Sequence, residues 1–256
     1  YSSGENNVAI GTEALNDFTT ATRNVAIGAD SLHRNETGDD NVAVGYYAGY
    51  NATGSKNTSV GRNAGRGANS APYGSATRNV AVGYEALEKF TTGGSNVAIG
   101  AQAGVEVTSG GYHVLIGNQA GQKLTTSNYN THIGYRASRY NTGAYNISIG
   151  TQALLGVNGS STGGNNIAIG NSSAYNLTTG IYNVGLGNET LKNLTTGQKN
   201  TALGYISLQH IRTATDSVGV GYSAGRYASG SYNTFVGSEA GKGGTTSAPY
   251  SSGEGN

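Results

Sequence analysis

A five-residue motif, Asn-Val-Ala-Ile-Gly at residues 96–100, recurs with small variations fourteen times between residues 7 and 237 of this 256-residue chain. Successive motifs are mostly 16 or 17 residues apart, and two gaps are longer, at 22 and 20 residues. Self-similarity at a short, fixed period indicates a solenoid, in which each coil buries its apolar side chains against neighbouring coils. Position 0 of each coil is the motif glycine: Gly11, Gly28, Gly45, Gly61, Gly83, Gly100, Gly117, Gly134, Gly150, Gly170, Gly187, Gly204, Gly221 and Gly237.

The motif has the pattern of a short strand. Position −1 is Ile, Val or Leu in every coil, and position −3 is Val, Ile or Thr. Aliphatic and β-branched residues at a period of two, ended by Gly, predict a strand with one buried face. We expect positions −1 and −3 to form that face, and position −2 to lie on a less confined one. Position −2 is small in most coils but is Leu115, His132 or Phe235 in others.

The rest of the coil predicts a second strand and a turn. A small residue at position +3 is commonly followed by Leu or Gly at position +4, and a second, weaker strand is expected there. A turn of the type Thr-Thr-Gly, as at residues 91–93, would then return the chain, with its Gly supplying a positive φ.

Position −4 is Asn in twelve of the fourteen coils, with His113 and Ser217 as the exceptions. Stacked Asn amides can hydrogen-bond from coil to coil and satisfy backbone groups at a corner. Asn is also favoured simply as a turn residue. Both interpretations give this column a structural role.

The pattern predicts a single repeat domain over residues 1–256. A longer period of about 87 residues groups the coils into five-coil modules bounded near residues 66–78, 155–165 and 241–256. Because the repeat resumes in phase, these boundaries are expected to be loops that bulge from the stack. Residues 1–5 and 250–254 share the sequence Tyr-Ser-Ser-Gly-Glu, which suggests either a piece of a longer repetitive chain or ends that stack head to tail.

Composition excludes several classes of protein. A chain with 43 Gly, 2 Pro and 11% charged residues is not an ordinary globular domain, while the regular placement of aliphatic residues argues against disorder. A net charge of +1, from 15 basic and 14 acidic residues, predicts no binding to nucleic acid. Because the chain has no Cys and no run of eighteen apolar residues, disulfides and membrane insertion are not expected.

The motifs that could carry chemistry are weak. Residues 219–225 mimic a dinucleotide fingerprint without a surrounding βαβ unit, so no cofactor is expected. Glu85 and Glu88 are the nearest carboxylate pair, but they fit a solvated edge better than a glycosidase cleft. No metal site is expected, since Asp is too rare for calcium-binding repeats and the four His fall in different registers. Ice binding is disfavoured because paired Thr such as Thr178 and Thr179 would point in opposite directions. We therefore expect no enzymatic activity.

One surface column is the candidate site. Position −5 is Tyr112, Tyr129, Tyr145, Tyr182 and Tyr232 in five coils, and Arg or Lys in several others. Tyr combines a flat apolar face with a polar tip, which suits stacking on a sugar ring or on a neighbouring chain. The alternative is a cross-coil aromatic ladder that only stabilises the fold.

The core of each coil is too thin for a chain on its own. About four small apolar side chains must offset an ordering cost on the order of 1.5 kcal/mol for each of 17 residues. A lone solenoid would therefore be marginal, whereas several chains packed around an axis would bury a second face through Ala and Gly. A single-chain hexapeptide helix is the competing arrangement, but it needs an aliphatic residue every six positions.

The motifs at residues 7–11, 24–28 and 96–100, each followed by two variable residues and Ala or Ser, resemble the head repeats of trimeric autotransporter adhesins. The longer phrase at residues 79–93 resembles repeats of bacteriophage tail fibres and related bacterial tail-fibre-domain proteins more closely. The 17-residue period departs from the shorter period of the adhesin heads.

The resemblance implies an all-β, homotrimeric parallel β-solenoid, or β-roll, of about fourteen 17-residue coils. Its expected function is a structural fibre: the rigid shaft or receptor-binding part of a phage tail fibre, attached to a glycan or protein of the host surface. A bacterial surface adhesin or extracellular filament subunit that assembles head to tail is the alternative. The expected location is the virion tail fibre, or the cell surface and extracellular space.

Overall fold

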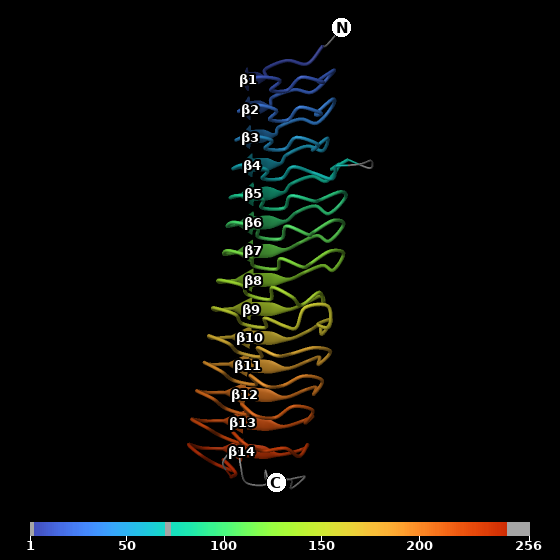
Figure 1. The fold of residues 1–256 in the computed structure, drawn as a ribbon. Helices are drawn as coiled ribbons and strands as arrows, with labels where there is room; N and C mark the ends of the chain where they lie inside the picture. The colour runs from blue at the N-terminus through green and yellow to red at the C-terminus, as the bar shows by residue number, and fades with distance from the viewer. Residues whose placement is uncertain (1–2, 70–72, 245–256) are drawn as a thin grey trace. The chain divides into compact units, whose positions relative to one another are not determined.

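The computed structural model describes residues 3–69 and 73–244 (Figure 1). It is an all-β parallel β-solenoid with fourteen three-residue strands, one in each motif, so the predicted fold class is confirmed. The chain forms two compact units, Tyr1–Asn130 and Thr131–Asn256. The homotrimer, the single-domain extent and the five-coil modules stay predictions.

In the first unit the strands pair in chain order, and each lies beside the next along the stack (Figure 1). Every pair is parallel and joins equivalent motif positions, as Val8 with Val25. The strands are β1 (Val8–Ile10), β2 (Val25–Ile27), β3 (Val42–Val44), β4 (Thr58–Val60), β5 (Val80–Val82), β6 (Val97–Ile99) and β7 (Val114–Ile116).

The second unit repeats this arrangement in its own seven strands, again parallel and in chain order. They are β8 (Thr131–Ile133), β9 (Ile147–Ile149), β10 (Ile167–Ile169), β11 (Val184–Leu186), β12 (Thr201–Leu203), β13 (Val218–Val220) and β14 (Thr234–Val236).

The long gaps leave the strand pairing intact. Strand β4 pairs in register with β5 across residues 66–78, and β9 pairs in register with β10 across residues 155–165. The parallel register therefore resumes after each segment, whereas the prediction that both bulge from the stack stays a prediction. The third boundary, residues 241–256, lies mostly outside the described residues. The same holds for the similar sequences at the two ends of the chain.

The strands bury the face opposite to the predicted one. In all fourteen strands the outer two residues are half-buried or exposed, while the middle residue is buried in every strand except β1. In β6, Ala98 is fully buried and Ile99 is 39% exposed. The prediction that positions −1 and −3 face the interior is therefore wrong. The physical reason is that small residues at position −2 allow the two walls of a thin coil to approach closely.

Large residues at position −2 are buried as well, because a nearby Gly makes room for them. Leu115 is fully buried, and a Cβ on Gly104 would lie 2.6 Å from its Cδ1 atom. Phe235 packs in the same way against Gly225 and Gly241. The interior is thus filled by matched large and small positions, and position −2 is not the less confined face.

The segment after the motif is a turn, and no second strand is assigned to it in the part of the chain that the structure describes. Positions +2 and +4 adopt left-handed backbone conformations, as at Glu85 (φ 56°) and Leu87 (φ 47°). Such conformations interrupt a strand, so that prediction is wrong. The side chains still fill the core: Ala86, Leu87 and Phe90 form one buried cluster with Ala98.

The Asn column forms the predicted hydrogen-bonded ladder. Asn96 Oδ1 accepts the backbone N–H of His113 at 3.0 Å, and its Nδ2 donates to the carbonyl of Gly110 at 3.0 Å. The backbone N–H of Asn96 donates in turn to Oδ1 of Asn79 at 2.9 Å. The Asn96 side chain therefore satisfies one donor and one acceptor on the backbone of the next coil, while its own backbone N–H is satisfied by the Asn of the preceding coil.

The two exceptions to Asn preserve the acceptor. His113 Nδ1 accepts the backbone N–H of Asn130 at 3.2 Å, and Ser217 Oγ accepts that of Asn233 at 3.3 Å. The ladder thus requires position −4 to carry an acceptor for the backbone N–H of the same position in the next coil.

The turn glycines are needed for close approach and not for positive φ. Gly93 is absent from the left-handed region, but a Cβ there would collide with the carbonyl oxygen of Gly110. The left-handed residue at this corner is position −5, as at Ser95 (φ 59°). Motif glycines meet both demands: Gly100 has φ +127°, and its Cβ would lie 2.7 Å from the carbonyl carbon of Gly117.

Candidate functional site

The five candidate Tyr side chains at position −5 are all exposed, by 50–60%. In the first unit Tyr112 and Tyr129 come from adjacent coils and stack with ring centroids 5.0 Å apart and an interplanar angle of 10°. In the second unit, Tyr182 and Tyr232 are separated by two coils that carry Lys199 and Asp216 at this position. The column is therefore solvent-facing, and within the second unit Tyr182 and Tyr232 do not lie in adjacent coils.

Other members of position −5 also interact from coil to coil. Arg23 Nε donates to Asp40 Oδ1 at 2.6 Å, so two adjacent coils are joined by an exposed ion pair. The hydrogen bond from Arg23 lowers the pKa of the Asp40 carboxyl, and the same pair raises the pKa of the guanidinium. Contacts between neighbouring coils therefore favour the stabilising-ladder interpretation of this column.

The larger surface feature is the aliphatic face, defined as positions −1 and −3 of each strand, which are Val, Ile or Leu except for a Thr at position −3 in β4, β8, β12 and β14. Parallel in-register pairing aligns these side chains into two continuous columns in each unit. In the interior of the stacks, Ile27, Val42, Ile99, Ile147, Ile169 and Leu203 are 36–45% exposed. With three-residue strands and seven coils, the face covers roughly 300 Å² per unit. A patch of this size is comparable to the largest apolar patch on a typical soluble monomer, and such patches are often functional.

The sequence pattern missed the aliphatic face as a surface because alternation alone does not say which side of a strand is inside. It also missed a second exposed aromatic column at position +1, formed by Tyr46, Tyr84, Tyr135, Tyr205 and Tyr222, each 44–51% exposed. Tyr205 and Tyr222 stack at 5.8 Å with an interplanar angle of 14°. The recurrence of Tyr directly after the motif Gly was the available signal.

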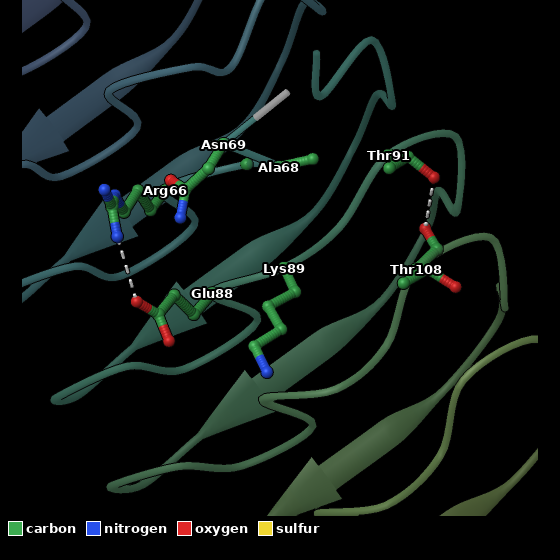
Figure 2. A pocket seen from close by; sticks show the side chains of 8 residues that line it. Arg66, Ala68, Asn69, Glu88, Lys89, Thr91 and Thr108 are labelled. Atoms are coloured by element: carbon green, nitrogen blue, oxygen red, sulfur yellow. Dashed lines mark hydrogen bonds and ion pairs between the residues drawn. The ribbon is translucent and has the colours of Figure 1, made fainter. Parts of the chain in front are cut away.

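A hollow of about 260 Å³ lies beside the first long insertion. Arg66 and Glu88 lie at one end of it and Thr91 and Thr108 at the other, with Lys89 between them (Figure 2). Arg66 Nη1 lies 3.3 Å from Glu88 Oε1, and Thr91 Oγ1 donates to the Thr108 carbonyl at 3.2 Å. Lys89 is held at 3.0 Å by Glu106 outside the hollow, so the charged side chains that line it already have partners.

The carboxylate pair considered for glycosidase chemistry is split between different partners. Glu88 pairs with Arg66, whereas Glu85 accepts a hydrogen bond from Gln102 Nε2 at 2.9 Å. An acid–base pair needs two carboxyl groups that face one cleft with different protonation behaviour. Here each carboxylate is held by its own partner, so the geometry gives no support to such a pair.

The dinucleotide-like glycines at residues 219–225 serve packing. A Cβ on Gly219 would lie 2.5 Å from Ser207 Oγ, and Gly225 lies against Phe235. Both positions are therefore filled by side chains of the solenoid core, as in sister coils.

Three of the four His serve local packing. Burial lowers the pKa of His113 to about 4, and His132 Nδ1 hydrogen-bonds with Ser148 Oγ at 2.8 Å inside the second unit. His210 stacks on Tyr227, and burial, with Arg226 nearby, lowers its pKa. His33 differs from these because it is surrounded by the carboxyl groups of Glu13, Asp17 and Asp30.

Comparisons with protein-family models, curated proteins and solved structures find no match to this chain. No helix in residues 3–69 and 73–244 is long and apolar enough to cross a membrane. The class that the fold defines is therefore a parallel β-solenoid repeat protein.

Proposed function

We propose that this chain is a non-enzymatic structural fibre protein that trimerises through its aliphatic face. In this proposal the trimer is the rigid shaft or receptor-binding part of a phage tail fibre and attaches to a glycan or protein of the host cell surface. The observation that carries the proposal is the exposed aliphatic face. The number of chains and the phage setting come from the resemblance of residues 79–93 to tail-fibre repeats.

The free energy available from this face is large. Burying about 300 Å² of apolar surface per unit is worth on the order of 7 kcal/mol, before the entropic cost of association. The face repeats at the spacing of the coils. A second copy of the chain has the same spacing and the same side chains, so it matches the face along its length. These arguments favour self-association over a partner without a repeat.

Charge placed on the aliphatic face tests the assembly. We expect Ile99→Lys and Ile169→Lys, one in each unit, to shift a trimer to monomers, because a Lys buried in an apolar interface loses its hydration. Sedimentation velocity and light scattering measure the number of chains directly.

Ser95→Lys is the matched control, since it adds the same charge to the coil of Ile99. Position −5 already holds Lys56 and Lys199 in other coils, so this change suits the local backbone. A wild-type chain that stays monomeric at micromolar concentration contradicts the proposed assembly, as does an Ile99→Lys variant that remains trimeric.

Host attachment is tested separately with purified protein and intact cells. We expect the protein to bind host cells and to compete with attachment of the native particle, while electron microscopy shows the fibre on the virion. Failure to compete would remove the attachment role and leave the self-association untouched.

The Tyr column is tested with Tyr129→Ser and Tyr145→Ser. If the column only stabilises the fold, the melting temperature falls and attachment by the folded protein is unchanged. A loss of attachment at an unchanged melting temperature instead assigns these side chains to receptor contact.

A further inference from the structure

His33 lies at a cluster of carboxylates contributed by two adjacent coils of the first unit. Its Nδ1 atom is 3.5 Å from Glu13 Oε2 and 3.4 Å from Asp30 Oδ1. This nitrogen is shielded from solvent and has no hydrogen-bond partner. The imidazole edge that faces the two carboxylates is therefore polar, buried and unsatisfied, which is unusual in a folded protein.

The spacing of these three groups fits a metal ion. Ligand bonds of about 2.0–2.1 Å in a tetrahedral site place neighbouring ligand atoms about 3.3–3.4 Å apart. The two separations from His33 Nδ1 are close to that value. One ligand atom from each of Glu13, Asp30 and His33 lies within 4.8 Å of the others, and the half-exposed Glu13 side chain is free to close the remaining edge.

The other edge of the ring faces a carboxylate that is placed to support a metal-bound His. Nε2 lies 3.6 Å from Asp17 Oδ2, just beyond hydrogen-bonding distance, and the ring stacks on Tyr50 at 4.9 Å with an interplanar angle of 25°. A metal-bound His commonly donates its second ring N–H to a carboxylate, which fixes the tautomer. Asp17 is placed for that role, and it leaves the Nδ1 lone pair directed toward Glu13 and Asp30.

We propose that His33 Nδ1, Glu13 and Asp30 form a binding site for a divalent transition-metal ion of the zinc type, with water completing the coordination. An imidazole with two carboxylates suits zinc and its neighbours in the first transition row. Calcium prefers six to eight oxygen ligands, which this cluster does not supply.

The proposed ion joins the coil of β1 to the coil of β2. In the described part of the chain β1 pairs with β2 alone, and all three of its residues are exposed. A link from Glu13 to Asp30 and His33 would therefore stabilise a coil whose strand pairs on one side only. This role does not depend on the proposed fibre function.

Calorimetric titration of the metal-free chain with Zn²⁺ tests the site, together with the absorption spectrum of bound Co²⁺. We expect one strongly bound ion per chain and a higher melting temperature with zinc. His33→Gln is expected to abolish binding, and Glu13→Gln to weaken it at least tenfold. Asp17→Asn, which alters only the supporting contact, is expected to weaken binding about tenfold while retaining the Co²⁺ spectrum.

His210→Gln is the matched control. His210 also stacks on a Tyr, with ring centroids 4.7 Å apart from Tyr227, but its surroundings are mainly Arg and Lys. The His210→Gln variant should therefore bind zinc as the wild type does. Glu13 is exposed, so its variant remains informative if His33→Gln fails to fold.

Three results would overturn the proposal. These are no zinc binding by the wild type, zinc binding that His33→Gln leaves unchanged, and a preference for Ca²⁺ over Zn²⁺.

Discussion

The replacement of Asn96 by Ala tests the hydrogen-bonded ladder at a single rung. Asn96 is fully buried, and the substitution removes the acceptor for the His113 N–H and the donor for the Gly110 carbonyl. The bond from the Asn96 backbone to Asn79 remains, because it does not involve the side chain. The damage is therefore confined to one side of the rung.

The expected cost follows from these two lost bonds. Each contributes about 1 kcal/mol, and leaving the buried His113 N–H without a partner adds about 1–3 kcal/mol. Asn96→Ala should thus lower the free energy of unfolding by about 3–5 kcal/mol. Asn96→Ser should cost only about 1 kcal/mol, because Ser217 already fills this position and its Oγ accepts the backbone N–H of Asn233.

Denaturant unfolding measures both variants at equal protein concentration, so that any self-association affects them alike. Single coils of a repeat protein can unfold before the whole protein does. Hydrogen exchange at the His113 amide therefore measures the local stability of this rung. That amide should exchange much faster in Asn96→Ala than in Asn96→Ser. Equal exchange rates, or stabilities that differ by less than about 0.5 kcal/mol, would refute a structural role for the ladder.

Two further predictions concern the backbone and pH. Gly100→Ala should lower the free energy of unfolding by more than about 3 kcal/mol, because φ is +127° and the new Cβ would lie 2.7 Å from the carbonyl carbon of Gly117. Gly159→Ala should lower it by only about 1 kcal/mol, because φ is +75° and the space around the new Cβ is open. Thermal melts compare the two, and equal losses would contradict the close-approach argument. Burial lowers the pKa of His113 from 6.5 to about 4, so the unfolded chain takes up a proton first on acidification. The stability present above about pH 6.5 should fall by up to about 3 kcal/mol between pH 6.5 and pH 4. His113→Asn should remove that part of the acid dependence, and an identical pH profile in the variant would show that another group causes it.

The sequence by itself determined the number of coils, the position of each strand and the pairing register. A recurring motif is local information: Asn at position −4, an aliphatic residue at position −1 and Gly at position 0 specify the same short conformation in each coil. The Asn ladder could be predicted for the same reason, and so could a column of exposed Tyr at position −5. The insertions at residues 66–78 and 155–165 were recognisable because the motif resumes after each of them.

Only the tertiary structure decided which face of the strand is inside. A period of two assigns residues to two faces but does not distinguish them, and the larger aliphatic side chains favoured the wrong choice. Ala98 is buried and Ile99 exposed because the coil is too thin to hold β-branched residues from both walls. Leu115 fits only because Gly104 lies opposite to it in another coil, a match that no single motif contains.

The cluster around His33 has the same origin. Glu13 belongs to one coil, and Asp30 and His33 belong to the next, so their separation along the chain does not predict a shared site. The left-handed turns at Glu13 (φ 55°) and Asp30 (φ 58°), together with coil stacking, bring the three side chains together. The repeated motif thus determines the strand and turn within each coil. Contacts between side chains of different coils depend on backbone turns and packing that exist only in the folded protein.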